Sequence, residues 1–304
     1  MNKEKNIPTP SGSGMDDRFR ISGTTDLFCL LGSPVRHSLS PRMHNESFRL
    51  LGIDAVYLCF DVDEAALPDA VKGLVRCGVK GFNLTMPDKN AVIPLLDELS
   101  PSARLTGAVN TVVNRNGTLT GYNTDGAGLI RALAERGTSV SGQDITILGS
   151  GGAASAIAAQ AALDGAASIK IFLRSSSRYF ERTERLASAL SRETGCHLSL
   201  HDLQDKNDLR QAVSASSVLI QATSVGMAPD TEACLIPGSS WLHAGLTVAD
   251  VIYHPKETRL LSMAKEAGCT ICPGLDMLLF QGAEAFRLWT GKEMPAEKIR
   301  RILF

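Results

Sequence analysis

The feature that most constrains the fold of this chain is a glycine-rich turn between a strand and a helix. Residues 145–148, Ile-Thr-Ile-Leu, form an apolar run that predicts a short buried strand. Residues 153–163 are rich in alanine and predict a helix, which Gly165 is suited to end. A further apolar run at 168–173 predicts a second strand. The order strand, helix, strand indicates a βαβ unit and therefore an α/β fold with a parallel sheet.

Small residues fill this turn at the spacing that dinucleotide-binding proteins use. Gly149, Gly151 and Ala154 occupy the three positions of the pattern. The first glycine permits a tight turn, the second lets backbone N–H groups approach a pyrophosphate, and the helix N-terminus supplies positive potential. The turn therefore predicts dinucleotide binding. A turn without a ligand and a methyltransferase-type turn stay open as alternatives on this pattern alone.

The loop after the second predicted strand bears on which dinucleotide is bound. An acid at this place would bind the ribose 2′-OH of NAD, but residues 174–178 are Arg-Ser-Ser-Ser-Arg. Arg174 and Arg178, with the serines between them, suit a 2′-phosphate through charge-assisted hydrogen bonds. NADP is therefore the predicted cofactor, with NAD, or an ordinary basic loop, as the alternative.

Length and composition exclude several classes of protein. A chain of 304 residues, with 44% hydrophobic and 21% charged residues, is typical of a soluble protein of about two domains. The net charge of −1 gives no reason to expect nucleic acid or an anionic membrane as a partner. No apolar run predicts a membrane span or a signal peptide, and seven dispersed cysteines indicate reduced thiols, so we expect a cytoplasmic protein. Cys269 and Cys272 are expected in the core, and no cluster has the spacing of a metal site.

Residues 27–31 form the first predicted strand, and two hydroxyl residues follow it. Ser38 and Ser40 lie two residues apart in a loop before a helix, where ligand loops of α/β proteins occur. Together they could hold a carboxylate without adding a charge. Ser40 precedes Pro41 and is equally suited to cap the helix, so both interpretations stay open for Ser40.

A lysine and an aspartate are the predicted acid–base groups. Pro87 suits the first position of a helix, which would place Lys89 in its first turn, where a cation opposes the helix dipole. Asp125 precedes a predicted helix at 127–136, at the crossing into the nucleotide-binding part. A solvated lysine and a helix-capping aspartate are the alternatives. Asn110 is expected within a strand at 107–113.

Several motifs together, in order, resemble the shikimate dehydrogenase family from about residue 27 to the end, and the C-terminal part is similar to its quinate/shikimate branch. The motifs are Ser38-Leu-Ser40-Pro41, Asn83-Leu-Thr85-Met-Pro87-Asp-Lys89, Ala108-Val-Asn110-Thr111, Tyr122-Asn-Thr-Asp125-Gly126, the glycine turn, Tyr253-His-Pro255 and Gln281-Gly282. The predicted fold is α/β with two domains. A substrate domain with a mixed sheet comprises residues 23–127 and 262–304, and a Rossmann-type nucleotide domain with a doubly wound parallel sheet comprises 128–261. Residues 1–22 are expected to form a flexible tail.

The resemblance implies a role for each matching residue. Lys89 and Asp125 would be the catalytic pair. Substrate contacts would come from Ser38, Ser40, Thr85, Asn110, Tyr253 and Gln281. The cofactor would be lined by Gly149, Ser150, Gly151, Gly152, Ala153, Arg174, Arg178, Thr223, Val251 and Gly274.

The implied activity is the reversible NADP-dependent interconversion of 3-dehydroshikimate and shikimate in the chorismate pathway. Quinate with NAD, and a non-catalytic dinucleotide-binding regulator, are the alternatives, and a homodimer is an open option. The sequence departs from the family pattern at Leu173 and Gln221, where Asn is usual, and at Asp276, where Gly is usual. Ser176 stands where NAD-using members carry an acid. Asp276 is expected beside the nicotinamide, where its carboxylate would affect cofactor affinity or substrate choice.

Overall fold

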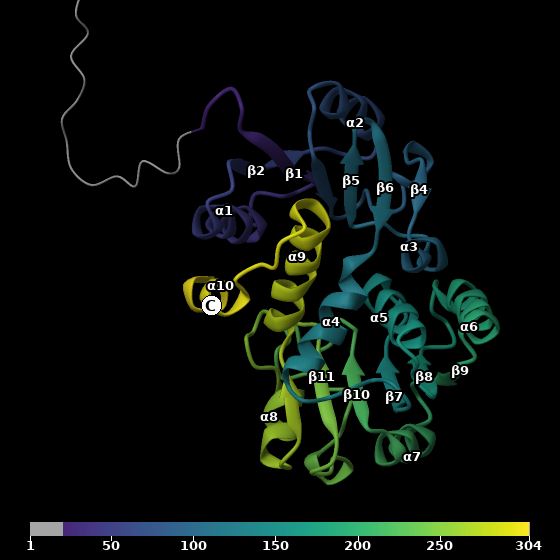
Figure 1. Cartoon of the computed structure of the whole chain (residues 1–304). Coiled ribbons are helices and arrows are strands. Elements are labelled where there is room, and N and C mark those ends of the chain that lie inside the picture. Colours follow the sequence, from purple (N-terminus) through teal and green to yellow (C-terminus); the bar gives the residue numbers. More distant parts are fainter. Residues whose placement is uncertain (1–20, 304) are drawn as a thin grey trace, which may run out of the picture.

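The computed structural model describes residues 21–303 and contains two sheets, one above the other in Figure 1. Of the predicted tail at 1–22, only Ile21 and Ser22 lie within the described residues. The first sheet is mixed, with strand order β2-β1-β3-β5-β6-β4, and the second is parallel, with order β12-β11-β10-β7-β8-β9. The predicted α/β class, with one mixed and one parallel sheet, is confirmed.

The first sheet brings together strands from the first 122 residues. They are β1 (Asp26–Gly32), β2 (Ala55–Asp61), β3 (Gly81–Leu84), β4 (Glu98–Leu99), β5 (Thr111–Arg115) and β6 (Thr118–Tyr122). The accompanying helices are α1 (Ser40–Leu51), α2 (Leu67–Arg76), η1 (Ile93–Leu95) and α3 (Pro101–Thr106). Asn116 and Gly117 have φ values of 56° and 95° and form the tight turn of the β5–β6 hairpin, because both positions need the left-handed conformation.

The second sheet contains the predicted βαβ unit. Its strands are β7 (Asp144–Leu148), β8 (Ser168–Leu173), β9 (His197–Asp202), β10 (Val218–Gln221), β11 (Thr247–Asp250) and β12 (Thr270–Cys272). Its helices are α5 (Gly152–Leu163), α6 (Phe180–Thr194), α7 (Lys206–Ala215), η2 (Ser239–Trp241) and α8 (Arg259–Glu266). Because β12 pairs with β11, the second sheet continues to Cys272, past the predicted boundary at 261. Cys272 is buried, as expected of a core cysteine, whereas Cys269 is only partly buried.

Three helices join the two sheets: α4 (Thr124–Glu135), α9 (Gly274–Thr290) and α10 (Ala296–Leu303). Helix α9 packs along α4 and reaches the first sheet, where Trp289 Nε1 donates a hydrogen bond of 3.0 Å to Val112 O. Helix α4 also packs on α5. A Cβ at Gly126 would collide with the backbone of Ala156 in α5, so this approach requires glycine. The start of α4 is thereby held against the helix that follows the glycine turn.

Candidate active site

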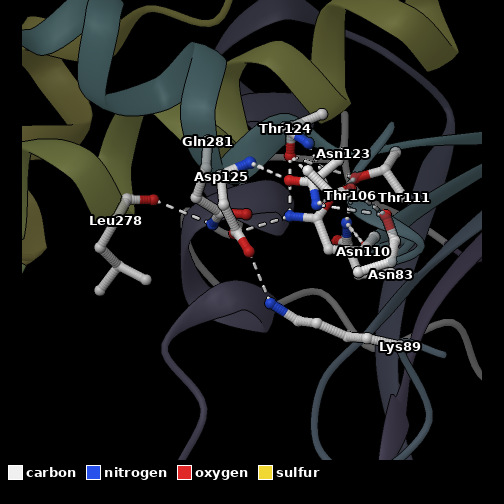
Figure 2. Close-up of polar contacts among 11 residues, drawn as sticks. Asn83, Lys89, Thr106, Asn110, Thr111, Asn123, Thr124, Asp125, Leu278 and Gln281 are labelled. Atoms are coloured by element: carbon white, nitrogen blue, oxygen red, sulfur yellow. Dashed lines mark hydrogen bonds and ion pairs between the residues drawn. The ribbon is translucent and has the colours of Figure 1, made fainter. Parts of the chain in front are cut away.

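A lysine and an aspartate meet at the end of the first sheet that faces α4 (Figure 2). Lys89 Nζ lies 2.7 Å from Asp125 Oδ2, and their side chains are 30% and 16% exposed. The pair is therefore open to a small molecule but largely shielded from bulk water, which strengthens its electrostatic interaction. The backbone also fixes this place, because Lys89 O accepts a hydrogen bond of 2.8 Å from Val109 N.

The chain around Lys89 differs from the expected helix. Residues 86–92 form turns, and the next helical turn is η1 at Ile93. Pro87 is as well suited to a turn as to a first helical position, because its fixed φ is common to both. Lys89 therefore does not lie at a helix N-terminus, and its ammonium group is positioned by Asp125 instead.

Asn110 holds the other oxygen of Asp125. Its Nδ2 donates to Asp125 Oδ1 at 2.8 Å, and its Oδ1 accepts from Thr124 N at 2.8 Å. Asn110 directly precedes β5 rather than lying within a strand. Asn123 caps α4 by accepting from Asp125 N at 3.1 Å, so the capping alternative for Asp125 is wrong. Asp125 lies in the first turn of α4 with its carboxylate directed at Lys89 (Figure 2).

The remaining predicted substrate residues lie on other elements of the two sheets. Ser40 begins α1 without capping it, and Ser38 Oγ accepts a hydrogen bond of 3.2 Å from Ser40 N. The capping interpretation of Ser40 is therefore wrong. Thr85 directly follows β3, and Gln281 lies near Asp125 in Figure 2, with its Nε2 donating to Leu278 O at 3.0 Å. Tyr253 is 46% exposed in the loop after β11, which ends before it.

The glycine turn has the geometry that a pyrophosphate needs. Gly149 has a φ of 119°, and a Cβ there would lie 2.7 Å from Ala222 O, so only glycine fits. A Cβ at Gly151 or Gly152 would meet no atom within 4 Å, which leaves open space at the start of α5. No side chain caps this helix N-terminus, so its N–H groups remain available to an anion. Ala153 follows in the first turn.

The loop after β8 lies beside this turn. Ser150 Oγ and Ser177 Oγ are 3.2 Å apart, which joins the glycine turn to the loop that carries Arg174 and Arg178. Both arginines are exposed. The guanidinium of Arg178 lies 4.8 Å from the centre of the Tyr179 ring and donates to its hydroxyl at 2.6 Å. A cationic loop next to the open turn therefore fits a dinucleotide with an additional phosphate.

The other predicted cofactor residues lie at neighbouring strand ends. Gln221 accepts from Thr223 Oγ1 at 3.0 Å and donates to Val225 O at 2.9 Å, so this departure from the family pattern folds the loop after β10. At the start of α9, a Cβ at Gly274 would press on Val251 O, 2.6 Å away. All these residues follow the carboxyl ends of parallel strands, where open α/β sheets bind ligands.

Asp276 is placed differently from the expectation. Its carboxylate is 5% exposed and pairs with Arg136 Nη2 at 2.6 Å and Arg300 Nη2 at 3.1 Å. Arg136 follows α4 and Arg300 lies on α10, so Asp276 ties three helices together. The carboxylate is engaged by these two arginines instead of being offered to a cofactor.

Asp250, at the end of β11, gives the fold a pH dependence. Burial raises the pKa of its carboxyl to about 6 from 3.8, against hydrogen bonds from Ile252 N and Thr258 Oγ1. Between about pH 4 and 6 the folded protein holds a proton that the unfolded chain has lost, so the free energy of unfolding falls as the pH rises. We expect Asp250→Asn to remove roughly 3 kcal/mol of this dependence. Urea unfolding of both proteins at several pH values measures it, and parallel pH curves would contradict the raised pKa.

Two further findings limit the chemistry of the described residues. Between residues 21 and 303, no group of three or more His, Cys, Asp or Glu side chains could hold a metal ion. Every helix in that range is too short or too polar to cross a bilayer. A proton-carrying pair beside one sheet and a dinucleotide-type turn at the end of the other define the class as a nicotinamide-dependent oxidoreductase of a small molecule.

Known proteins resemble this chain along nearly its whole length. The model of the shikimate dehydrogenase substrate binding domain matches residues 30–112, and that of the shikimate 5'-dehydrogenase C-terminal domain matches residues 274–304. A shikimate dehydrogenase (NADP(+)) from Listeria innocua is 47% identical over 94% of this chain and 98% of its own length. The chain therefore belongs to the shikimate dehydrogenase family.

Solved structures show the same relationship. Shikimate 5-dehydrogenase from Listeria monocytogenes, in complex with shikimate and NAD, is 47% identical with a TM-score of 0.91, covering 94% of this chain and 98% of that one. Quinate dehydrogenase from Corynebacterium glutamicum, in complex with NAD, is 30% identical with a TM-score of 0.80, covering 91% and 98%. The two-sheet architecture is thus shared by members with different substrates.

Proposed function

We propose that this chain is an NADP-dependent shikimate dehydrogenase, which interconverts 3-dehydroshikimate and shikimate reversibly. The observation that carries the proposal is the Lys89–Asp125 pair, 2.7 Å apart and held by Asn110. The relative at 47% identity that bears this name supports the same activity. The reaction would belong to the chorismate pathway. A cytoplasmic location and a homodimer stay predictions.

The catalytic pair handles the proton of the reaction. A nicotinamide cofactor held by the glycine turn and the basic loop would supply the hydride in the reductive direction and accept it in the oxidative one. During reduction, negative charge develops on the keto oxygen of the substrate, and the Lys89 ammonium group stabilises that charge and delivers a proton. Asp125 keeps the ammonium group in place through Oδ2, and Asn110 prevents the carboxylate from rotating by binding Oδ1. Partial exposure of Lys89 lets solvent restore its proton.

Neutral groups orient the substrate in this proposal. Ser38 and Ser40 would bind the carboxylate of the ring acid through their hydroxyls, and Thr85, Asn110, Tyr253 and Gln281 would contact its ring hydroxyls. Fixing both ends of a small ring places the reacting carbon in one position, which lowers the entropic part of the barrier.

The cofactor assignment rests on the basic loop beside the glycine turn. Replacing both Arg174 and Arg178 by alanine removes the groups proposed to bind the 2′-phosphate. We expect the KM for NADP to rise on the order of 10²-fold, with little change for NAD, because only NADP carries that phosphate. Steady-state kinetics with each nucleotide measures this. Arg185→Ala is the matched control, because it removes an exposed arginine from α6, outside the loop. Equal losses for both nucleotides would contradict the assignment.

The proposed activity is tested by crossing two substrates with two cofactors. Purified protein is assayed for reduced nicotinamide with shikimate or quinate, each with NADP or NAD. If kcat/KM is highest for shikimate with NADP among the four mixtures, the result supports the proposal. Preference for quinate with NAD, which the resemblance to quinate dehydrogenase makes the second candidate, would replace it. Absence of turnover in all four mixtures, with ligand binding intact, would indicate a regulator.

A further inference from the structure

A buried tyrosine hydroxyl lies at the far end of the hydrogen bonds that support the catalytic pair. Tyr57, in β2, is fully buried, and its hydroxyl donates to Asn83 Oδ1 in β3 at 2.8 Å. Strand β1 lies between these strands, so the side chain reaches across it. Burial raises the pKa of Tyr57 well above its usual value, and the hydroxyl therefore keeps its proton and stays a donor. Such a buried hydroxyl needs a partner, because leaving it unbonded costs free energy.

The hydrogen bonds run from this hydroxyl to Asp125 in one direction. Asn83 Nδ2 donates to Thr111 Oγ1 at 2.9 Å and to Asn110 O at 3.0 Å. Thr111 Oγ1 donates to Asn110 Oδ1 at 3.1 Å, and Asn110 Nδ2 donates to Asp125 Oδ1 at 2.8 Å. Figure 2 shows the part from Asn83 to Lys89. Donors and acceptors alternate without conflict, and aligned hydrogen bonds of this kind strengthen one another.

One orientation of the Asn83 amide satisfies all its neighbours, and the Tyr57 hydroxyl completes it. Both protons of Asn83 Nδ2 are already used, so Oδ1 has to face a donor, and the Tyr57 hydroxyl is that donor. The opposite orientation of the amide would place Nδ2 against the tyrosine and an oxygen against Asn110 O. The orientation of Asn83 then determines that Thr111 donates to Asn110, and that Asn110 offers its Nδ2 to Asp125.

The same tyrosine is fixed to helix α1, which begins at Ser40, one of the two predicted carboxylate-binding serines. His44 of α1 stacks on its ring, with centres 4.6 Å apart and an angle of 18° between the planes. Burial lowers the pKa of His44 to about 3, so this ring is neutral. Asn45 of α1 binds Tyr57 N at 2.8 Å and Tyr57 O at 2.9 Å. The Ser40 side chain lies close enough to the Tyr57 hydroxyl to lower its pKa slightly against the larger effect of burial.

We infer that Tyr57 is a positioning residue for the reaction, which holds the Asp125 carboxylate through Asn83, Thr111 and Asn110. Ser40, which is proposed to bind the substrate carboxylate, lies next to the same hydroxyl. Tyr57 therefore links that end of the site to the end where the reaction occurs. This role rests on the proposed function. Tyr57 itself is buried and acts only through these neighbours.

Tyr57→Phe tests this role, because it keeps the ring and removes only the hydroxyl. We expect kcat with shikimate and NADP to fall on the order of 10-fold, because Asp125 is less well oriented, with an unchanged KM for NADP. Thr146→Val is the matched control. Thr146 Oγ1 lies 2.8 Å from Ser216 Oγ, fully buried in β7 of the second sheet, so its loss should lower stability and leave kcat unchanged. A wild-type kcat in folded Tyr57→Phe would overturn the inference.

A double-mutant cycle shows whether Tyr57 acts through Asn83. Asn83→Ala should lower kcat by itself. Adding Tyr57→Phe to that variant should then lower kcat by less than about 2-fold, because both changes act on the same chain of hydrogen bonds. Two independent losses that multiply would overturn the inference. If Tyr57→Phe does not fold, Thr111→Val removes a later link, and a wild-type kcat for that variant has the same meaning. Wild-type protein that turns over none of the four substrate–cofactor mixtures refutes the proposed function instead.

Discussion

Replacing Lys89 by methionine is expected to lower kcat for shikimate oxidation by roughly 10³-fold, because the variant keeps the length of the side chain but has no ammonium group for the proton. The loss should appear in kcat more than in the KM for shikimate or NADP, since the charge that Lys89 stabilises develops mainly in the transition state. Steady-state and single-turnover kinetics at saturating substrate measure it.

The control for this prediction is Lys80→Met. Lys80 directly precedes β3, and its Nζ pairs with Asp26 at 3.5 Å, with both side chains about half exposed. This change removes a lysine from the same part of the chain and should leave kcat within about 2-fold of the wild type. A Lys89→Met protein with the kcat of Lys80→Met would show that Lys89 is not the proton donor.

Replacing Asp276 by alanine is expected to lower the free energy of unfolding by about 3 kcal/mol. Removing the buried carboxylate leaves Arg136 and Arg300 without the anion that neutralises them, and this loss costs more than the intact cluster contributes. The change also removes the carboxylate that links α9 to α4 and α10. Urea unfolding followed by circular dichroism measures the change.

Glu297→Ala is the matched control for Asp276→Ala. Glu297 pairs with Arg300 Nη1 at 2.6 Å, but its side chain is 65% exposed, so its removal should cost no more than about 1 kcal/mol. The Asp276→Ala variant also tests the expectation, implied by the family resemblance, that the Asp276 carboxylate affects cofactor affinity. A stable Asp276→Ala protein with a changed KM for NADP would mean that the carboxylate acts on the cofactor and not on the packing of the helices.

The sequence predicted the parts of the fold that depend on local patterns. The strand at 145–148, the glycine turn and the hairpin at Asn116-Gly117 follow from apolar runs and from backbone conformations that glycine and asparagine favour. The Lys89–Asp125 pair was expected from family motifs, and the structure places its two atoms in contact.

Features that depend on distant partners were not predictable in this way. The local sequence predicts a helix start at Pro87, but the backbone of Lys89 is held by Val109, so a turn forms. The strand at 270–272 is short, and only its pairing with β11 shows that it belongs to the second sheet. Asp276 pairs with Arg136, which follows α4, and with Arg300 on α10. No local pattern gives these pairings.

The hydrogen bonds behind the catalytic pair were missed for the same reason. Tyr57 and Asn83 are 26 residues apart and lie on strands separated by another strand. Asn83 and Thr111 lie within two of the family motifs, but the resemblance implies no role for either residue. The signal available was the presence of amide and hydroxyl residues at strand positions otherwise filled by apolar side chains, since buried polar groups require partners.

The most direct test of the proposed reaction follows the hydrogen itself. Shikimate carrying deuterium on the ring carbon that bears the reacting hydroxyl is incubated with the protein and NADP, and the reduced nucleotide is analysed by mass spectrometry. Direct hydride transfer predicts that the reduced nucleotide carries the deuterium from the substrate. Reduced nucleotide without deuterium, or no reduced nucleotide from shikimate, would contradict the assignment of this site as a shikimate dehydrogenase.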